Sequence, residues 1–341
     1  MNPDDVREAE RAVHGGSDDP ELLDFSANIN PRSPEGTRSA YEAAFGESRR
    51  YPDDGYPAFR EAAASAVGCR PEQVVPTPGG LAAIRLAIAT RVEPGDDVLL
   101  PAPSFAEYAR EVTLQGGNAD FVSPSAIVDE DPSAYEMAVV CQPNNPTGEA
   151  VPPARLRAFA DRCRDAGTEL LVDEAFLDYT DLDSLAGEPG VVVARSLTKM
   201  YGLPGIRAGF AVATGDRLAD IRTARRPWAL STPAAAVGAH CLADEAFVAA
   251  TRERVADERE RLRAAIAERF DVRESVAPFL LFDAGEVGVD ALLAQARERG
   301  VVLRDARSFR GLDSHVRVAV KDRAANDRLL WALGLAPEPE S

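Results

Sequence analysis

Lys199 is the residue of this 341-residue sequence whose type and position most clearly suggest covalent chemistry. Of the 38 lysine and arginine residues, only Lys199 and Lys321 are lysines. A guanidinium keeps its proton in a protein, whereas a primary amine with an adjustable pKa can become free and attack an aldehyde to form an imine. We therefore interpret Lys199 as a candidate nucleophile; the alternative is an ordinary solvated loop lysine.

Asp173 supplies a carboxylate at the end of the apolar segment 169–173. A carboxylate at the C-terminal end of a strand points into the crevice where open α/β sheets bind ligands. In that position Asp173 would pair with a positively charged nitrogen of a ligand. A helix N-cap or a surface acid is the alternative interpretation of a single aspartate.

A second set of residues offers donors for a phosphate group. A Pro-Gly-Gly run leads from a short apolar strand into a helix, so the amides of Gly80, Leu81 and Ala82 would face an anion at the helix N-terminus. Ser196 adds a hydroxyl, and Arg207 adds a guanidinium that would form charge-assisted hydrogen bonds with the same phosphate.

Two further residues suit a flat, conjugated ligand. Phe105 could stack on a ring, although a core position is the commoner fate of a phenylalanine. Asn145 lies just past a strand, where its amide could donate to a phenolic oxygen. Pyridoxal phosphate needs an amine for its aldehyde, an anion against its ring nitrogen, donors for its phosphate and a flat neighbour. The sequence offers all of these groups.

Apolar runs that alternate with helical patterns must position these residues. The runs at 97–100, 119–122, 138–141, 169–173, 191–194 and 209–213 predict buried strands. Helices are predicted at 81–92, 154–165 and 217–225, and this alternation indicates a largely parallel α/β sheet. We assign it to a large domain over residues 40–230.

The pattern changes after residue 230. One long charged amphipathic helix is predicted from Thr232-Pro233 to Phe270, followed by strands at 279–282, 301–304 and 316–320 and helices at 290–298 and 323–333. We assign residues 231–336 to a smaller α+β domain. Residues 1–39 form an N-terminal arm, and residues 337–341 form a frayed tail.

Four short motifs carry a resemblance to a known family. Asn-Pro-Thr-Gly, Asp-Glu-Ala, Ser-Leu-Thr-Lys and Gly-Ile-Arg follow one another in that order. In their order and spacing the chain resembles the fold-type I pyridoxal phosphate enzymes of the aminotransferase class I/II superfamily over nearly its whole length. The resemblance implies a homodimer with active sites at the subunit interface, to which the N-terminal arm contributes, and places Tyr51 at the partner's cofactor phosphate.

Two branches of the superfamily are similar to this sequence, threonine-phosphate decarboxylase and histidinol-phosphate aminotransferase. The segment around His14-Gly15-Gly16 and 23–31 and the segment 309–320 look more like the decarboxylase. Phe176 stands where aminotransferases carry a tyrosine that binds the cofactor phenolate. A phenyl ring cannot donate that hydrogen bond, so the cofactor imine should keep its proton to higher pH; the alternative is that Phe176 only fills space.

The same resemblance implies roles in substrate binding. Arg317 matches the carboxylate-binding arginine of the family, and a bidentate grip there would favour loss of CO2 if it holds the bond from Cα to the carboxylate perpendicular to the ring. In an aminotransferase the Cα–H bond is aligned instead, and 2-oxoglutarate is the acceptor. Arg304, and His14 with Gly15, are candidates for the substrate phosphate, and Asn28 is a further candidate contact. A surface ion pair and a loose arm are the alternatives for Arg304 and His14.

Composition excludes several other classes of function. A net charge of −18 and a pI near 4.7 disfavour binding to nucleic acid or an anionic membrane, and the acidic N-terminus without an apolar stretch indicates a cytoplasmic protein. High acidity with arginine in place of lysine is typical of proteins soluble in a salty cytoplasm. Four scattered cysteines and three scattered histidines give no disulfide framework and no metal motif. A DNA-binding regulator with an aminotransferase-like domain is disfavoured by the same charge.

Overall fold

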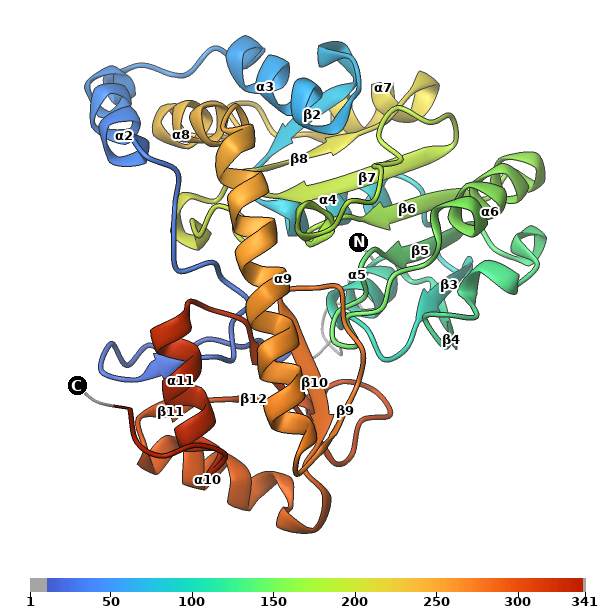
Figure 1. Ribbon diagram of the computed structural model, residues 1–341. Coiled ribbons are helices and arrows are strands. Elements are labelled where there is room, and N and C mark those ends of the chain that lie inside the picture. The colour runs from blue at the N-terminus through green and yellow to red at the C-terminus, as the bar shows by residue number, and fades with distance from the viewer. Residues whose placement is uncertain (1–10, 340–341) are drawn as a thin grey trace.

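The computed structural model describes residues 11–339, which form a larger and a smaller part joined by a long helix (Figure 1). The larger part is built on a seven-stranded sheet. Strand β8 runs antiparallel to both neighbours, and all other adjacent strands are parallel. This architecture confirms the predicted fold class. In sheet order, the strands are β2 (Val74–Thr77), β8 (Gly209–Val212), β7 (Val191–Ser196), β6 (Glu169–Asp173), β5 (Met137–Cys141), β3 (Asp97–Pro101) and β4 (Asn118–Val122).

Helices cover both faces of this sheet, which explains why its central strands read as continuous apolar runs. One face packs Ile84, Tyr108 and Ile221 from three helices. The opposite face packs Phe59 and Leu156 from two others. The first set comprises α4 (Gly80–Ala89), α5 (Glu107–Gln115) and α7 (Gly215–Ala224), and the second includes α3 (Pro57–Val67) and α6 (Pro153–Ala166).

The smaller part contains an antiparallel sheet in the order β12-β13-β10-β9. The predicted strand 301–304 is wrong as a single element, because Leu303 separates β11 from β12, which belong to different sheets. Strand β1 of the N-terminal segment pairs with β11. The elements are β1 (Leu23–Asp24), β9 (Asp271–Val272), β10 (Phe279–Asp283), β11 (Val301–Val302), β12 (Arg304–Asp305), β13 (His315–Ala319), α10 (Val289–Glu298) and α11 (Arg323–Ala332).

The single long helix predicted after residue 231 is two helices, α8 (Thr232–Leu242) and α9 (Glu245–Ala267). The break has a local cause, because the side chain of Asp244 accepts a hydrogen bond from the amide of Phe247 (2.9 Å) and caps α9. Helix α8 packs against α2 (Thr37–Phe45) and α3, while α9 runs from the larger part into the smaller (Figure 1). Within the described part of the chain no helix combines the length and apolar character needed to span a membrane.

Candidate active site

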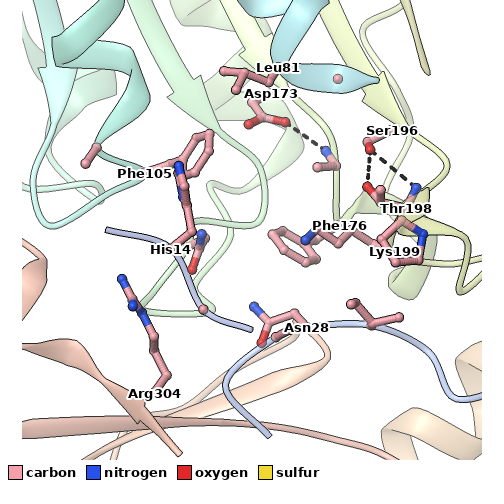
Figure 2. Close-up of a pocket in the computed structure, with 18 of the residues that line it drawn as sticks. His14, Asn28, Leu81, Phe105, Asp173, Phe176, Ser196, Thr198, Lys199 and Arg304 are labelled. Atoms are coloured by element: carbon pink, nitrogen blue, oxygen red, sulfur yellow. Dashed lines mark hydrogen bonds between the residues drawn. The ribbon is translucent and has the colours of Figure 1, made fainter. Parts of the chain in front are cut away.

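A cavity of about 360 Å³ lies between the two parts, and the predicted site residues gather around it. Figure 2 shows Asp173, Ser196 and Lys199 on one side and Arg304 on the other, with Phe105 and Phe176 between them. The structure thus brings together residues that are far apart in the sequence. The predicted residues that line the cavity are His14, Gly15, Asn28, Gly80, Leu81, Phe105, Asn145, Asp173, Phe176, Ser196, Lys199, Arg207, Arg304 and Arg317.

Two predicted residues do not line this cavity. Ala82 lies in the first turn of α4, where its amide donates to the carbonyl of Gly79 (3.2 Å). The amide is therefore already paired, whereas the sequence predicted that it would donate to a phosphate. Tyr51 is 77% exposed and stacks on Trp228 with ring centroids 4.2 Å apart. Its predicted role concerns the site of a second subunit.

Asp173 is the last residue of β6 and lies opposite Cys141 in the register of β5. Alternation along the strand puts its side chain on the same face as Leu171, which packs towards α4 and α5. Tyr108 donates to its Oδ2 (2.6 Å) and the amide of Ala175 donates to its Oδ1 (3.0 Å). Burial raises the pKa of Asp173, and these hydrogen bonds act in the opposite direction by stabilising the anion.

Lys199 lies in the turn after β7. Its carbonyl accepts a hydrogen bond from the amide of Asn30 (3.2 Å), which ties the turn to the N-terminal segment. Its Nζ lies 5.8 Å from the centroid of the Phe176 ring. Burial, followed by the positive charges of Arg317 and Arg207, lowers the pKa of Lys199 to about 8, although the carboxylate of Asp173 opposes this shift. At pH 7 the amine is therefore free in roughly a tenth of the molecules, a far larger share than for an ordinary lysine.

The N-terminus of α4 forms a cradle of bare backbone beside Ser196. A Cβ at Gly80 would lie 2.9 Å from the Cβ of Ser196, and Gly79 has a φ of 96°, a conformation that favours glycine. A Cβ at Gly209 would lie 2.6 Å from the carbonyl carbon of Gly79, so β8 also requires glycine where it passes the turn. Arg207 donates to the carbonyl of Pro78 (3.3 Å) and closes the cradle.

Arg304 and Arg317 form the cationic wall of the cavity. Arg304 donates to the carbonyl of Val13 and to Ser308 Oγ, both at 2.7 Å. Arg317 donates to Ser26 O (2.8 Å) and to the Oδ1 of Asn145. Within residues 11–339 neither guanidinium forms an ion pair with a carboxylate.

Two buried polar atoms at the arginines and beside them form no hydrogen bond within the part of the chain that the structure describes. The Nε of Arg317 and the Oδ1 of Asn28 are buried and lack a partner among the described residues. Burial, assisted by the charge of Arg304, lowers the pKa of Arg317 to about 9, so its guanidinium remains a cation at neutral pH. Buried cations without acidic partners attract anionic groups of a ligand.

The N-terminal segment covers one end of the cavity. His14 Nε2 lies 2.9 Å from Oε1 of the buried Glu107 at the start of α5. A Cβ at Gly15 would lie 2.2 Å from the carbonyl oxygen of Ser26, so only glycine permits this approach. The contact of His14 with Glu107 holds the segment against the larger part. The carbonyl of Val13 accepts a hydrogen bond from Arg304 on β12, which holds the segment against the smaller part.

Several residues at the site were not predicted from the sequence, and four of them matter most for its chemistry. Thr198, whose hydroxyl forms a hydrogen bond with Ser196, and Phe309 line the cavity, while Tyr108 and Glu107 bind lining residues from behind. The spacing of Phe105 and Tyr108 at i and i+3 is a signal for two side chains on one face. No comparable signal marks Glu107 or Phe309.

Comparison with known proteins identifies the family. Residues 20–333 match the family of aminotransferases class I and II. The chain is 31% identical over 329 residues to histidinol-phosphate aminotransferase 2 of Archaeoglobus fulgidus, covering 92% of this chain and 93% of that protein. It is 32% identical over 356 residues to threonine-phosphate decarboxylase of Salmonella typhimurium, covering 97% and 96%.

A solved structure shares the fold. The structure of histidinol-phosphate aminotransferase from Sinorhizobium meliloti in complex with pyridoxal-5'-phosphate superposes with a TM-score of 0.80 at 21% identity, covering 98% of this chain and 93% of that one. The cavity fits that cofactor: a half-buried amine, a buried carboxylate and a backbone cradle that any Cβ would fill surround one space. Lys199, Asp173 and the turn at Gly80 with Ser196 and Arg207 would hold its aldehyde carbon, ring nitrogen and phosphate. The chain therefore belongs to the aminotransferase class I and II family of pyridoxal phosphate-dependent enzymes.

Proposed function

We propose that this enzyme decarboxylates L-threonine O-3-phosphate to (R)-1-aminopropan-2-yl phosphate and CO2, as a step in adenosylcobalamin biosynthesis. The observation that carries the proposal is the pair of buried arginines, Arg304 and Arg317, which lack acidic partners within the described residues. L-Threonine O-3-phosphate carries a carboxylate and a phosphate in one small molecule. A substrate with two adjacent anions suits two adjacent buried cations.

Each cation has a proposed role. Arg317 binds the carboxylate, since the Nε that lacks a partner and its neighbouring nitrogens offer a bidentate donor set. Arg304 binds the phosphate together with His14 and the backbone at Gly15, which lie at the same end of the cavity. The unsatisfied Oδ1 of Asn28 offers an acceptor to the substrate.

Two residues hold or transfer a proton during the proposed reaction. Bound pyridoxal phosphate supplies the electron sink for the electron pair left when the bond to the carboxylate breaks. Asp173 holds the proton on the ring nitrogen, and Lys199 returns a proton to Cα after CO2 has left. With its pKa lowered to about 8, Lys199 exists in both protonation states near neutral pH, as a proton-transfer group requires.

Transamination of histidinol phosphate is the second candidate, and the similarity to the Archaeoglobus fulgidus aminotransferase supports it. The same residues would serve that reaction. Arg304 would bind the phosphate of histidinol phosphate, Arg317 would bind a carboxylate of 2-oxoglutarate, and Lys199 would move the proton from Cα. The two proposals differ in which bond to Cα is broken.

An acceptor-free assay separates the two reactions. The purified holoenzyme is incubated with L-threonine O-3-phosphate alone, and CO2 and aminopropanol phosphate are measured. If the enzyme is the decarboxylase, we expect CO2 and aminopropanol phosphate to be released in equal amounts. If turnover requires 2-oxoglutarate and histidinol phosphate is the better amine donor, the aminotransferase is the function.

We also infer a homodimer in which Tyr51 serves the partner's cofactor phosphate. The exposed stack of Tyr51 and Trp228 supports it, because Asp54 accepts from the amide of Trp228 (2.6 Å) and holds that segment at the surface. The test mixes Tyr51→Phe with Lys199→Arg subunits. If the sites are shared, activity should recover on mixing, since one site of each mixed dimer is intact. If both variants are dimeric and poorly active and their mixture stays inactive, the sites are not shared.

A further inference from the structure

Tyr108 is a fully buried phenol directly behind the cofactor cavity, with 1% of its surface exposed. It comes from α5, and its hydroxyl donates to Oδ2 of Asp173 (2.6 Å). Its ring packs edge-on against Phe105, with centroids 5.6 Å apart and an interplanar angle of 83°. One side chain therefore contacts both the proposed ring-stacking residue and the acid proposed for the ring nitrogen.

The hydrogen bonds of Asp173 fix the orientation of its carboxylate. Oδ2 accepts from Tyr108 and Oδ1 accepts from the amide of Ala175, so both oxygens are held in place. Rotation of the carboxylate would break both bonds at a buried position, where an unpaired charge is costly. Each oxygen still has a free lone pair for a further donor.

The other ionisable groups near Asp173 do not replace this bond. Cys141 from β5 lies beside the Tyr108 hydroxyl, and its own thiol donates to the carbonyl of Pro143 (3.3 Å). Arg195 from β7 forms ion pairs with Glu174 and Asp178 instead. Lys199 acts on Asp173 through its charge. The phenol is thus the side-chain hydroxyl donor that stabilises Asp173 as an anion.

We propose that Tyr108 is a positioning residue that holds Asp173 ionised and correctly oriented against the ring nitrogen of the cofactor. This inference rests on the assignment of Asp173 to that nitrogen and holds for either reaction discussed above. Loss of the phenol hydroxyl removes a hydrogen bond that stabilises the carboxylate of Asp173 as an anion. The ring nitrogen that pairs with this carboxylate is then less fully protonated. A ring with less positive charge lets the nitrogen that joins Lys199 to the cofactor keep its proton to higher pH.

The test compares two tyrosine-to-phenylalanine variants of the holoenzyme. Tyr108→Phe keeps the ring that packs edge-on against Phe105 and removes the hydroxyl, which donates to Asp173 and also lies beside the thiol of Cys141. Tyr56→Phe is the matched control, since Tyr56 is also buried and its hydroxyl donates to the carbonyl of Leu230 (2.9 Å) outside the cavity. The readouts are the pH midpoint of the visible cofactor absorption, the cofactor dissociation constant and the thermal unfolding midpoint.

Tyr108→Phe is expected to raise the pH midpoint and to weaken cofactor binding about 10-fold, the size of one hydrogen bond to a charged group. Tyr56→Phe is expected to lower only the unfolding midpoint. In an Asp173→Asn background, Tyr108→Phe should cause no further change in cofactor affinity. An unchanged midpoint and affinity in Tyr108→Phe, or equal changes in Tyr56→Phe, overturns the inference. These readouts need no substrate, so they are independent of the proposed reaction.

Discussion

Arg304 and Arg317 lie directly opposite each other in the antiparallel register of β12 and β13. Their guanidinium carbons lie 5.3 and 5.7 Å from the centroid of the same ring, that of Phe309. Like charges opposite each other destabilise a sheet, and both side chains are buried. The free enzyme therefore carries an electrostatic cost that an anionic substrate relieves.

Removal of one charge of this pair should weaken substrate binding without weakening the fold. Arg304→Gln is expected to raise KM for the phosphorylated substrate by roughly 10- to 100-fold, since a charge-assisted hydrogen bond is lost. The unfolding midpoint should stay equal or rise. Steady-state kinetics and thermal unfolding measure the two effects. Arg307→Gln is the control, because Arg307 lies outside the cavity and pairs with Asp290 and Asp305; equal losses in both variants would contradict the assignment.

The two lysines provide a direct test of covalent attachment. Lys199→Arg keeps the charge but cannot form the imine, so the visible absorption band of the imine should disappear. Lys321→Arg is the control, since Lys321 lies over the ring of Phe25 and does not line the cavity. It should absorb as the wild type does. Persistence of the band in Lys199→Arg would refute the attachment site.

The lowered pKa of Lys199 predicts how the cofactor-free protein takes up pyridoxal phosphate. Only the free amine attacks an aldehyde, so the rate of covalent uptake should rise with pH and reach half its maximum near pH 8. An ordinary lysine would give a midpoint near pH 10.4. Stopped-flow absorbance across pH 6–10 measures the profile. A rate that has not begun to level off by about pH 10 would mean that burial does not tune the amine.

Asp173→Asn should separate chemistry from stability. Turnover is expected to fall on the order of 100-fold or more, because the ring nitrogen loses its anion, while cofactor is retained. In the cofactor-free protein the raised pKa of Asp173 means that the folded state binds more protons than the unfolded state above pH 3.8. Stability therefore falls as pH rises through that window, and the variant escapes this loss. Unfolding at several pH values tests the sign; an equal slope in both proteins contradicts it.

Gly15→Ala should affect substrate binding and leave the cofactor in place. The new Cβ would lie 2.2 Å from a backbone oxygen, that of Ser26, and must displace the N-terminal segment. We expect a higher KM with unchanged visible absorption. Gly46→Ala is the control, because a Cβ there meets nothing within 4 Å. A wild-type KM in Gly15→Ala would show that this segment does not contribute to substrate binding.

Strands buried on both faces were predictable from the sequence to within two residues, since the run 191–194 forms β7 (Val191–Ser196). The residues 138–141 and 170–172 are all apolar, and they form the centres of β5 (Met137–Cys141) and β6 (Glu169–Asp173). The break between α8 and α9 was not predictable from periodicity, because the amphipathic pattern continues through it. A single side-chain cap by Asp244 ends that continuity.

The sequence by itself determined which reactive groups this protein has and in what order they occur. It identified Lys199 as one of two lysines and put Asp173 at the end of an apolar strand, since residue type and local periodicity are written in the chain. Only the tertiary structure decided that Tyr108 binds Asp173 and that Arg304 faces Arg317. Those relationships depend on packing between elements distant in the sequence, and local pattern carries no record of which surfaces meet.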